Sequence, residues 1–201
     1  MNQITFKQYR NIDLFIFGAL LTVSELIATF ASNKWFAAQP IVISTTLVFI
    51  CMVMMRWSWF ALIPACLGGA VFCIASGASI EQYLVYCVGN CAALAAMVYF
   101  RLWGKDGVRG SRIRLFIFVA TAYLSMQIGR WLLSLPFGGR LDTLLVYLGT
   151  DIISLLFAAV VMMLMKNTDG MIEDQKSYLF RLQREAEESR IKDGYGYDEN
   201  E

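Results

Sequence analysis

Six long apolar stretches occupy most of this 201-residue sequence and constrain its fold more than any other feature. The hydrocarbon core of a bilayer is about 30 Å thick, and a helix of about 20 apolar residues crosses it. The stretches have roughly this length and are bounded by charged residues, Gly or Pro. They predict an all-α, polytopic membrane protein built as a bundle of six transmembrane helices. The predicted spans are approximately residues 12–31, 40–55, 57–76, 80–100, 113–135 and 143–165.

Composition supports a membrane domain followed by a charged tail. Hydrophobic residues make up 58% of the chain and charged residues 16%, against about 45–50% and about 25% in soluble domains. Residues 166–201 hold 6 of the 17 basic and 10 of the 16 acidic residues. We therefore predict a transmembrane domain over residues 1–166, a short cytoplasmic amphipathic helix over 167–193, and a disordered tail over 194–201.

The positions of Lys and Arg predict the orientation in the membrane. Basic residues in short loops are retained on the cytoplasmic side during insertion. With the N-terminus inside, 14 of the 17 basic residues lie on the inner side, and only Lys34, Arg130 and Arg140 lie on the outer side or near it. The sequence thus predicts a multi-pass protein of the bacterial plasma membrane with both termini in the cytoplasm.

Several functional classes are disfavoured by what the sequence lacks. The chain contains no His, the usual proton shuttle and metal ligand. Its five Cys all lie inside predicted spans, where a thiol behaves as a small apolar group, so neither a disulfide framework nor a metal site is predicted. No phosphate-binding loop and no catalytic set is recognisable. We predict a protein that is not an enzyme, holds no cofactor and does not bind nucleic acid.

Polar side chains inside the spans are the candidate functional residues. An ionisable group within a span is costly and normally faces a cavity or a partner. Four predicted spans carry polar residues at helical spacing, and their depths place them together in the outer half of the bundle. The candidate substrate-binding residues are Glu25, Tyr86, Asn90, Tyr123, Gln127, Arg130, Tyr147 and Asp151.

These residue types suggest two interpretations. In the first, Arg130 holds a carboxylate or phosphate of a solute and an acidic residue holds an amine, which suits a mixed-charge or zwitterionic solute. In the second, Arg130 pairs with Asp151 or Glu25 and only holds the helices together. The sequence leaves both interpretations open.

Three local features point to a known family. They are the Arg56-Trp57 turn that leads into Trp59 to Gly69, the Tyr83 to Asn90 segment with its Gly89-Asn90 pair, and Asp151 on the last span. With its length and predicted topology, the chain resembles the substrate-binding S component of energy-coupling factor (ECF) transporters over most of residues 8–166. The resemblance implies that a vitamin-like or other small nutrient binds from outside. It also implies that a coupling membrane subunit with two ATPases delivers the nutrient.

A membrane scaffold of the MreD type is the alternative function. Its bundle would be similar, but its task would be to gather partner proteins. The buried charges would then only fix the helices, and the charged tail would be the working part.

The predicted topology is tested by a reporter fused after Glu201 that is active only outside the cytoplasm. We expect no reporter activity, because the positive-inside rule retains the C-terminus in the cytoplasm. The same reporter placed in the loop before Pro40 is the positive control. An active C-terminal fusion would contradict the topology.

Overall fold

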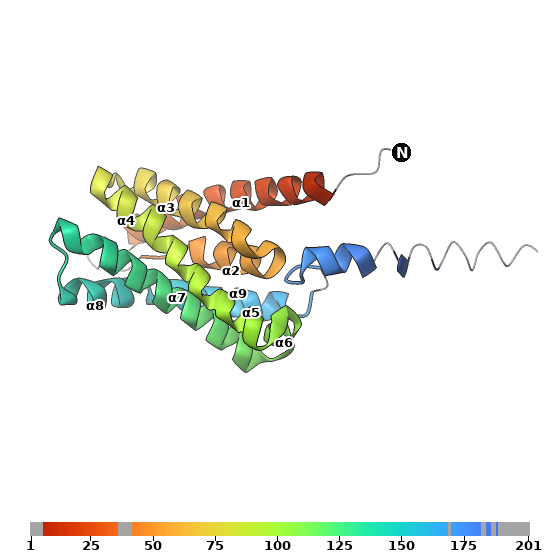
Figure 1. Ribbon diagram of the computed structural model, residues 1–201. Coiled ribbons are helices and arrows are strands. Elements are labelled where there is room, and N and C mark those ends of the chain that lie inside the picture. The colour runs from red at the N-terminus through yellow and green to blue at the C-terminus, as the bar shows by residue number, and fades with distance from the viewer. Residues whose placement is uncertain (1–5, 36–41, 169, 182–183, 186–187, 189–201) are drawn as a thin grey trace, which may run out of the picture.

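A computed structural model describes residues 6–35, 42–168, 170–181, 184, 185 and 188 of the chain. Within these residues the structure consists of helices, turns and short connections, without a strand, which confirms the predicted all-α class (Figure 1). The helices are α1 (Phe6–Trp35), α2 (Thr46–Trp57), η1 (Ser58–Ala61), α3 (Leu62–Ser76), α4 (Ile80–Asn90), η2 (Cys91–Met97), α5 (Val98–Leu102), α6 (Gly104–Gly110), α7 (Arg112–Ser134), η3 (Leu135–Phe137), α8 (Leu141–Thr150) and α9 (Ile152–Met165).

Four helical stretches are long and apolar enough to cross a membrane. They are Phe6–Lys34, Thr46–Ser76, Ile80–Leu102 and Arg112–Phe137. The helices α8 and α9 give a fifth if they count as one span, although they meet at an angle of 45°. The chain therefore has the helices of a multi-pass membrane protein, and the predicted count of six spans is not confirmed.

The stretch Thr46–Ser76 reverses direction at Ser58. A Cβ atom added to Gly68 would lie 2.3 Å from Oγ1 of Thr46, whereas 22 residues of continuous helix would separate these positions by about 33 Å. Ser58 has a φ of 54°, a conformation that is uncommon for a residue other than glycine. Helices α2 and α3 thus form a hairpin, and α2, with eleven of its twelve residues buried, is the central helix of the bundle.

The last predicted span is broken where a carboxylate interrupts it. Asp151 has φ −104° and ψ 11°, and the helix α9 starts at the next residue. The bend turns α8 away from the axis of α9, and none of the ten residues of α8 is buried. α8 is therefore only partly enclosed by the bundle.

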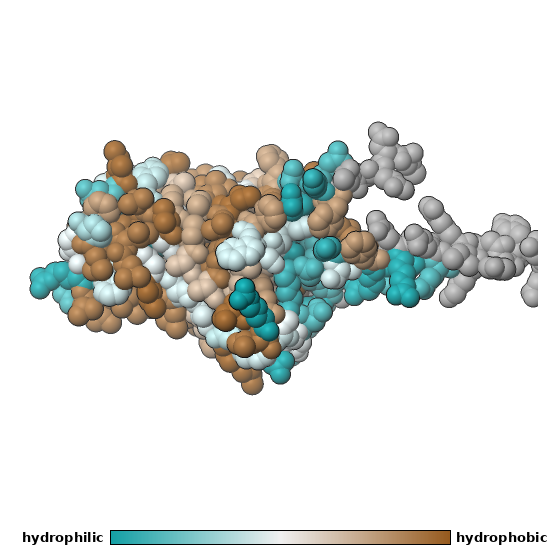
Figure 2. All heavy atoms as spheres, in the orientation of Figure 1, coloured by the Kyte–Doolittle hydropathy of each residue, from teal (hydrophilic) through white to brown (hydrophobic). Residues whose placement is uncertain are grey.

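Charged side chains gather at the end of the bundle that holds Asp13 and the start of α1, here called the charged end (Figure 2). Asp13 accepts hydrogen bonds from Nη2 of Arg56 at 2.7 Å, from Nε of Arg56 at 2.9 Å and from the indole N–H of Trp57 at 2.5 Å. Arg56 also donates to the carbonyls of Gly170 and Met171. This set joins α1, the end of α2 and the segment that follows α9.

The segment after α9 is held at the charged end by further ion pairs. Lys105 pairs with Asp174, and Arg109 pairs with Glu173. Of the predicted helix 167–193, the described residues 175–181 are helical, while 170–173 form a turn and bends. The predicted disordered tail, 194–201, lies outside the described residues.

Close packing of α4 on α7 depends on two glycines. A Cβ atom on Gly89 would lie 2.8 Å from Cα of Arg130, and one on Gly129 would lie 2.6 Å from the carbonyl oxygen of Gly89. Small residues let helix backbones approach in this way inside membranes. The contact fixes the backbone of Arg130 against α4.

We expect Gly89→Ala to lower the free energy of unfolding by about 1–3 kcal/mol, because the added methyl group meets backbone atoms that have no room to move. Gly149→Ala is the matched control, since a Cβ there meets no described atom within 4 Å. The control should leave stability unchanged or raise it by up to about 1 kcal/mol, because Ala is the better helix former. Unfolding in detergent measures both. Equal stability of the two variants would contradict the close approach of α4 and α7.

Candidate functional site

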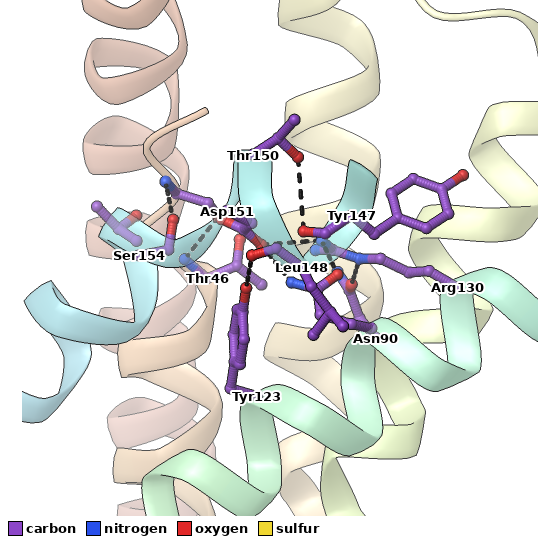
Figure 3. Close-up of polar contacts among 12 residues, drawn as sticks. Thr46, Asn90, Tyr123, Arg130, Tyr147, Leu148, Thr150, Asp151 and Ser154 are labelled. Atoms are coloured by element: carbon purple, nitrogen blue, oxygen red, sulfur yellow. Dashed lines mark hydrogen bonds and ion pairs between the residues drawn. The ribbon is translucent and has the colours of Figure 1, made fainter. Parts of the chain in front are cut away.

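A buried ion pair lies at the centre of a polar cluster in the half of the bundle away from the charged end (Figure 3). Nη1 of Arg130 lies 2.9 Å from Oδ2 of Asp151. Only 4% of Arg130 and 3% of Asp151 is exposed. Each partner is therefore removed from solvent, and an isolated charge at this place would be strongly unfavourable.

Two amide side chains complete the hydrogen bonds of the ion pair. Nε of Arg130 donates to Oδ1 of Asn90 at 2.8 Å, and Nη1 also donates to Oε1 of Gln127 at 3.1 Å. Nε2 of Gln127 donates to Oδ2 of Asp151 at 2.8 Å. Asn90 in turn donates to the carbonyl of Ala65 at 3.2 Å. The cluster thus connects α3, α4, α7 and the junction between α8 and α9.

The local sequence explains how these side chains meet. Gln127 and Arg130 are three residues apart and therefore lie on the same face of α7. Gly89 allows α4 to approach α7 closely, and this contact places the next residue, Asn90, beside the guanidinium group. Asp151 reaches the cluster because the chain bends at this residue between α8 and α9.

Glu25 forms a separate polar contact. Its Oε2 atom accepts hydrogen bonds from the backbone N–H of Thr45 at 2.8 Å, the hydroxyl of Thr45 at 2.9 Å and the backbone N–H of Thr46 at 3.1 Å. These donors lie at the N-terminus of α2, where helix N–H groups lack partners within the helix. A carboxylate is favourable there also because of the helix dipole. Glu25 thus caps the central helix.

A small cavity lies beside the ion pair. Its volume is about 10 Å³, which is room for about one water molecule. Its wall is formed by α2, α3, α4, α7 and α8, together with the segment before α2 and the bend at Asp151. The residues that line it are Val42, Ser44, Thr46, Gly68, Gly69, Phe72, Tyr86, Asn90, Arg130, Tyr147, Thr150 and Asp151.

Two wall residues carry a buried polar atom without a partner. Oδ1 of Asp151 and Oγ1 of Thr46 have no hydrogen-bond partner among the described residues. Asp151 is 3% exposed and Thr46 is 1% exposed. Leaving such atoms unsatisfied costs about 1–3 kcal/mol each. A native structure usually keeps unsatisfied groups where a ligand, an ion or water completes them.

Aromatic rings form another part of the wall. Tyr86 packs against Phe72 with ring centroids 4.8 Å apart and against Tyr147 with centroids 6.3 Å apart. The guanidinium carbon of Arg130 lies 4.8 Å from the centroid of the Tyr86 ring. The wall therefore combines an ion pair with the flat faces and edges of three rings.

The structure brings most of the predicted site residues together. Tyr86, Asn90, Arg130, Tyr147 and Asp151 line the cavity. The remaining three do not line it. Gln127 supports the ion pair from behind, and the hydroxyl of Tyr123 donates to the carbonyl of Leu148 at 2.6 Å, whereas Glu25 caps α2.

Some wall residues were missed by sequence reasoning. Ser44 and Thr46 come from a run of three hydroxyl residues inside an apolar stretch, which was the available signal. Gly68 and Gly69 belong to the wall because α3 packs closely on α2 and α4 there. Phe72 carries no polar atom, and in the sequence it is indistinguishable from a lipid-facing ring.

The site offers hydrogen-bonding and aromatic groups rather than metal ligands. Among the described residues, no three His, Cys, Asp or Glu side chains lie together as a metal site requires. The sulfur atoms of Cys66 and Cys91 lie 3.6 Å apart on α3 and η2. Neither residue lines the cavity.

Comparison with known proteins assigns no family. No protein-family model matches the chain, and no curated protein or solved structure is significantly similar to it.

We expect Asp151→Ala to lower the free energy of unfolding by about 3–5 kcal/mol, because it leaves the buried charge of Arg130 unpaired. Arg130→Ala should cost a similar amount, and the double variant should cost less than the sum of the two. Denaturant unfolding in detergent measures the cycle. Asp142→Ala, at an exposed position of α8, is the control and should change stability by less than about 0.5 kcal/mol. Additive effects of the two single variants would contradict a direct ion pair.

Proposed function

We propose that the chain is a membrane-embedded, solute-binding subunit for uptake of a small nutrient from outside the cell. In this proposal it acts as ECF S components do, in the bacterial plasma membrane, with six transmembrane segments and both termini in the cytoplasm. A coupling membrane subunit and two ATPases would supply the energy, since the sequence contains no phosphate-binding loop.

The observation that carries the proposal is the pair of unsatisfied polar atoms on the cavity wall. Oδ1 of Asp151 and Oγ1 of Thr46 are buried and have no partner among the described residues. A polar cluster that only joined helices would be stable with every atom paired. Unpaired atoms beside a cavity are what a binding site offers to a ligand before it arrives.

The position of the cavity supports access from outside. Asp13 marks the charged end, and Glu25 lies twelve residues further along α1, a distance of about 18 Å. Thr45 and Thr46, which contact Glu25, are thus in the half of the bundle away from the charged end. If the basic charged end faces the cytoplasm, as the positive-inside rule predicts, the cavity opens toward the outside.

In this proposal α8 is the cover of the site, that is, the helix that moves to admit the solute. It contributes Tyr147 and Thr150 to the wall, and no residue of α8 is buried. Two hydrogen bonds hold its C-terminal end: Tyr123 donates to the carbonyl of Leu148, and the N–H of Val42 donates to the carbonyl of Thr150 at 2.9 Å. Displacing α8 around the bend at Asp151 would break these bonds and enlarge the cavity.

A membrane scaffold remains the second candidate, and one observation favours it. The Arg130–Asp151 pair is hydrogen-bonded on several sides, as expected of a group that fixes helices. The tail argues in the other direction, because Glu173 and Asp174 are already paired with Arg109 and Lys105 of the same chain. These two acidic groups are engaged within the chain and are not offered to a partner.

The proposal predicts that the protein, purified in mild detergent, retains a small molecule and brings ATPase and coupling subunits with it. Mass spectrometry of the preparation detects both. Tyr147→Ala should reduce the retained molecule by about tenfold, because it removes one ring of the wall. Val146→Ala, at a neighbouring position that is 54% exposed, is the control and should retain it fully.

Absence of both the small molecule and the ATPase would favour the scaffold. A preparation that contains neither a small molecule nor an ATPase, but does contain other membrane or cell-envelope proteins, would overturn the transport proposal.

A further inference from the structure

The polar atoms of the cavity wall differ in whether they already have hydrogen-bond partners within the protein. Nε and Nη1 of Arg130 donate to Asn90, Gln127 and Asp151 inside the protein. Oδ2 of Asp151 accepts from both Arg130 and Gln127. Among the fully buried atoms of the ion pair, Oδ1 of Asp151 is without a hydrogen-bond partner in the described part of the chain, and a carboxylate oxygen only accepts hydrogen bonds.

A second unpaired atom lies on the same wall. Oγ1 of Thr46 is buried and, like any hydroxyl, can both donate and accept. Figure 3 shows Thr46 on α2 beside Asp151, on the side of the cluster opposite Arg130. A ligand with an N–H donor and a second polar atom, as in an amide, a lactam or an amino-substituted nitrogen ring, has groups that suit these two wall atoms.

The charge of the wall is balanced. Among the described residues that line the cavity, Arg130 and Asp151 are the only Lys, Arg, Asp or Glu side chains, and their opposite charges lie 2.9 Å apart. A carboxylate or phosphate placed against the unpaired Oδ1 of Asp151 would meet repulsion in a medium of low dielectric constant. Next to this oxygen the wall therefore favours a neutral group that donates a hydrogen bond.

The rings of the wall add a shape requirement. Phe72, Tyr86 and Tyr147 are all half-buried, and the ring of Tyr86 contacts the other two. Stacked and edge-on contacts with such rings favour a flat ligand.

We infer that the solute of this site is a flat, uncharged compound that presents an N–H donor to Oδ1 of Asp151, with no carboxylate or phosphate on the part that enters the cavity. This inference rests on the proposed solute-binding function and specifies its substrate class. It replaces the expectation that Arg130 captures an anionic group of the solute.

Binding of such a compound requires a wider cavity than the one described. A volume of about 10 Å³ holds about one water molecule. The movable part of the wall is α8, which carries Tyr147 and Thr150. Asp151 lies at the bend where α8 joins α9, so the acceptor stays beside its α7 partners while the cover moves.

Two probes of the same shape test the inference on the full-length protein in detergent. Benzamide presents an N–H donor and a carbonyl, whereas benzoate is an anion with acceptors only. We expect benzamide to bind at least about tenfold more tightly than benzoate, because benzoate leaves the buried acceptor unsatisfied and benzamide does not. Ligand-observed NMR titration measures both affinities.

A matched pair of variants identifies the wall atoms. Thr46→Val removes a hydroxyl that bonds to no described residue, so the fold should be unaffected while benzamide affinity falls by about three- to tenfold. Thr29→Val is the control, because Thr29 also has a buried, unpaired hydroxyl but does not line the cavity. It should bind benzamide as the unaltered protein does, and thermal unfolding verifies that both variants fold.

The outcomes separate the substrate class from the function. The inference is overturned if benzoate binds as tightly as benzamide, if Thr46→Val binds benzamide as well as Thr29→Val does, or if neither probe binds. The proposed function stands in each of these cases if a small molecule co-purifies with the protein, and it falls if none does. A co-purified flat compound with an N–H donor and no acidic group supports both.

Discussion

The buried Arg130–Asp151 ion pair requires close contacts and hydrogen bonds from its surroundings, and the neighbouring helices provide them. Two charges in an apolar bundle are tolerated only with close geometry and additional hydrogen bonds. Asn90 and Gln127 supply these bonds. Gly89 in turn lets α4 approach the backbone of Arg130. The positions of three helices relative to one another thus follow from the requirement to satisfy one guanidinium group.

Charged side chains are paired differently at the two ends of the bundle. At the charged end, acidic and basic side chains pair across α1, α2, α6 and the segment after α9, close to where the chain leaves the bundle. At the other end, Glu25 caps α2 and the ion pair lies beside a cavity with two unpaired atoms. The ion pairs at the charged end hold helices and the following segment together, and the unpaired atoms beside the cavity are the ones that the proposed function assigns to a ligand.

The all-α class, the location of most helices and part of the site could be predicted from the sequence. Apolar length and helical periodicity are local properties, and they located most helices and the polar faces of α4 and α7. The break at Asp151 and the role of Glu25 could not be predicted in this way. Glu25 has the correct depth and spacing for the cluster, but the N-terminus of α2 provides three donors that lie closer to it. Thr46 was missed because the run of hydroxyl residues 44–46 is a weak local signal, and its place on the wall follows from the α2–α3 hairpin, a long-range contact.

In the proposed site, Asp151 would connect ligand binding to a movement of α8, because it takes part in the polar cluster and also forms the bend. Its Oδ2 atom is fixed to α7 by Arg130 and Gln127, while its backbone forms the bend between α8 and α9. A ligand shifts a conformational equilibrium only by its difference in affinity for the two states. In the proposed site, a donor on Oδ1 and a ring against Tyr147 would be bound together only when α8 has closed over the solute. The binding free energy would then favour the closed cover, so that a single residue at a helix break links recognition of the solute to enclosure of the site.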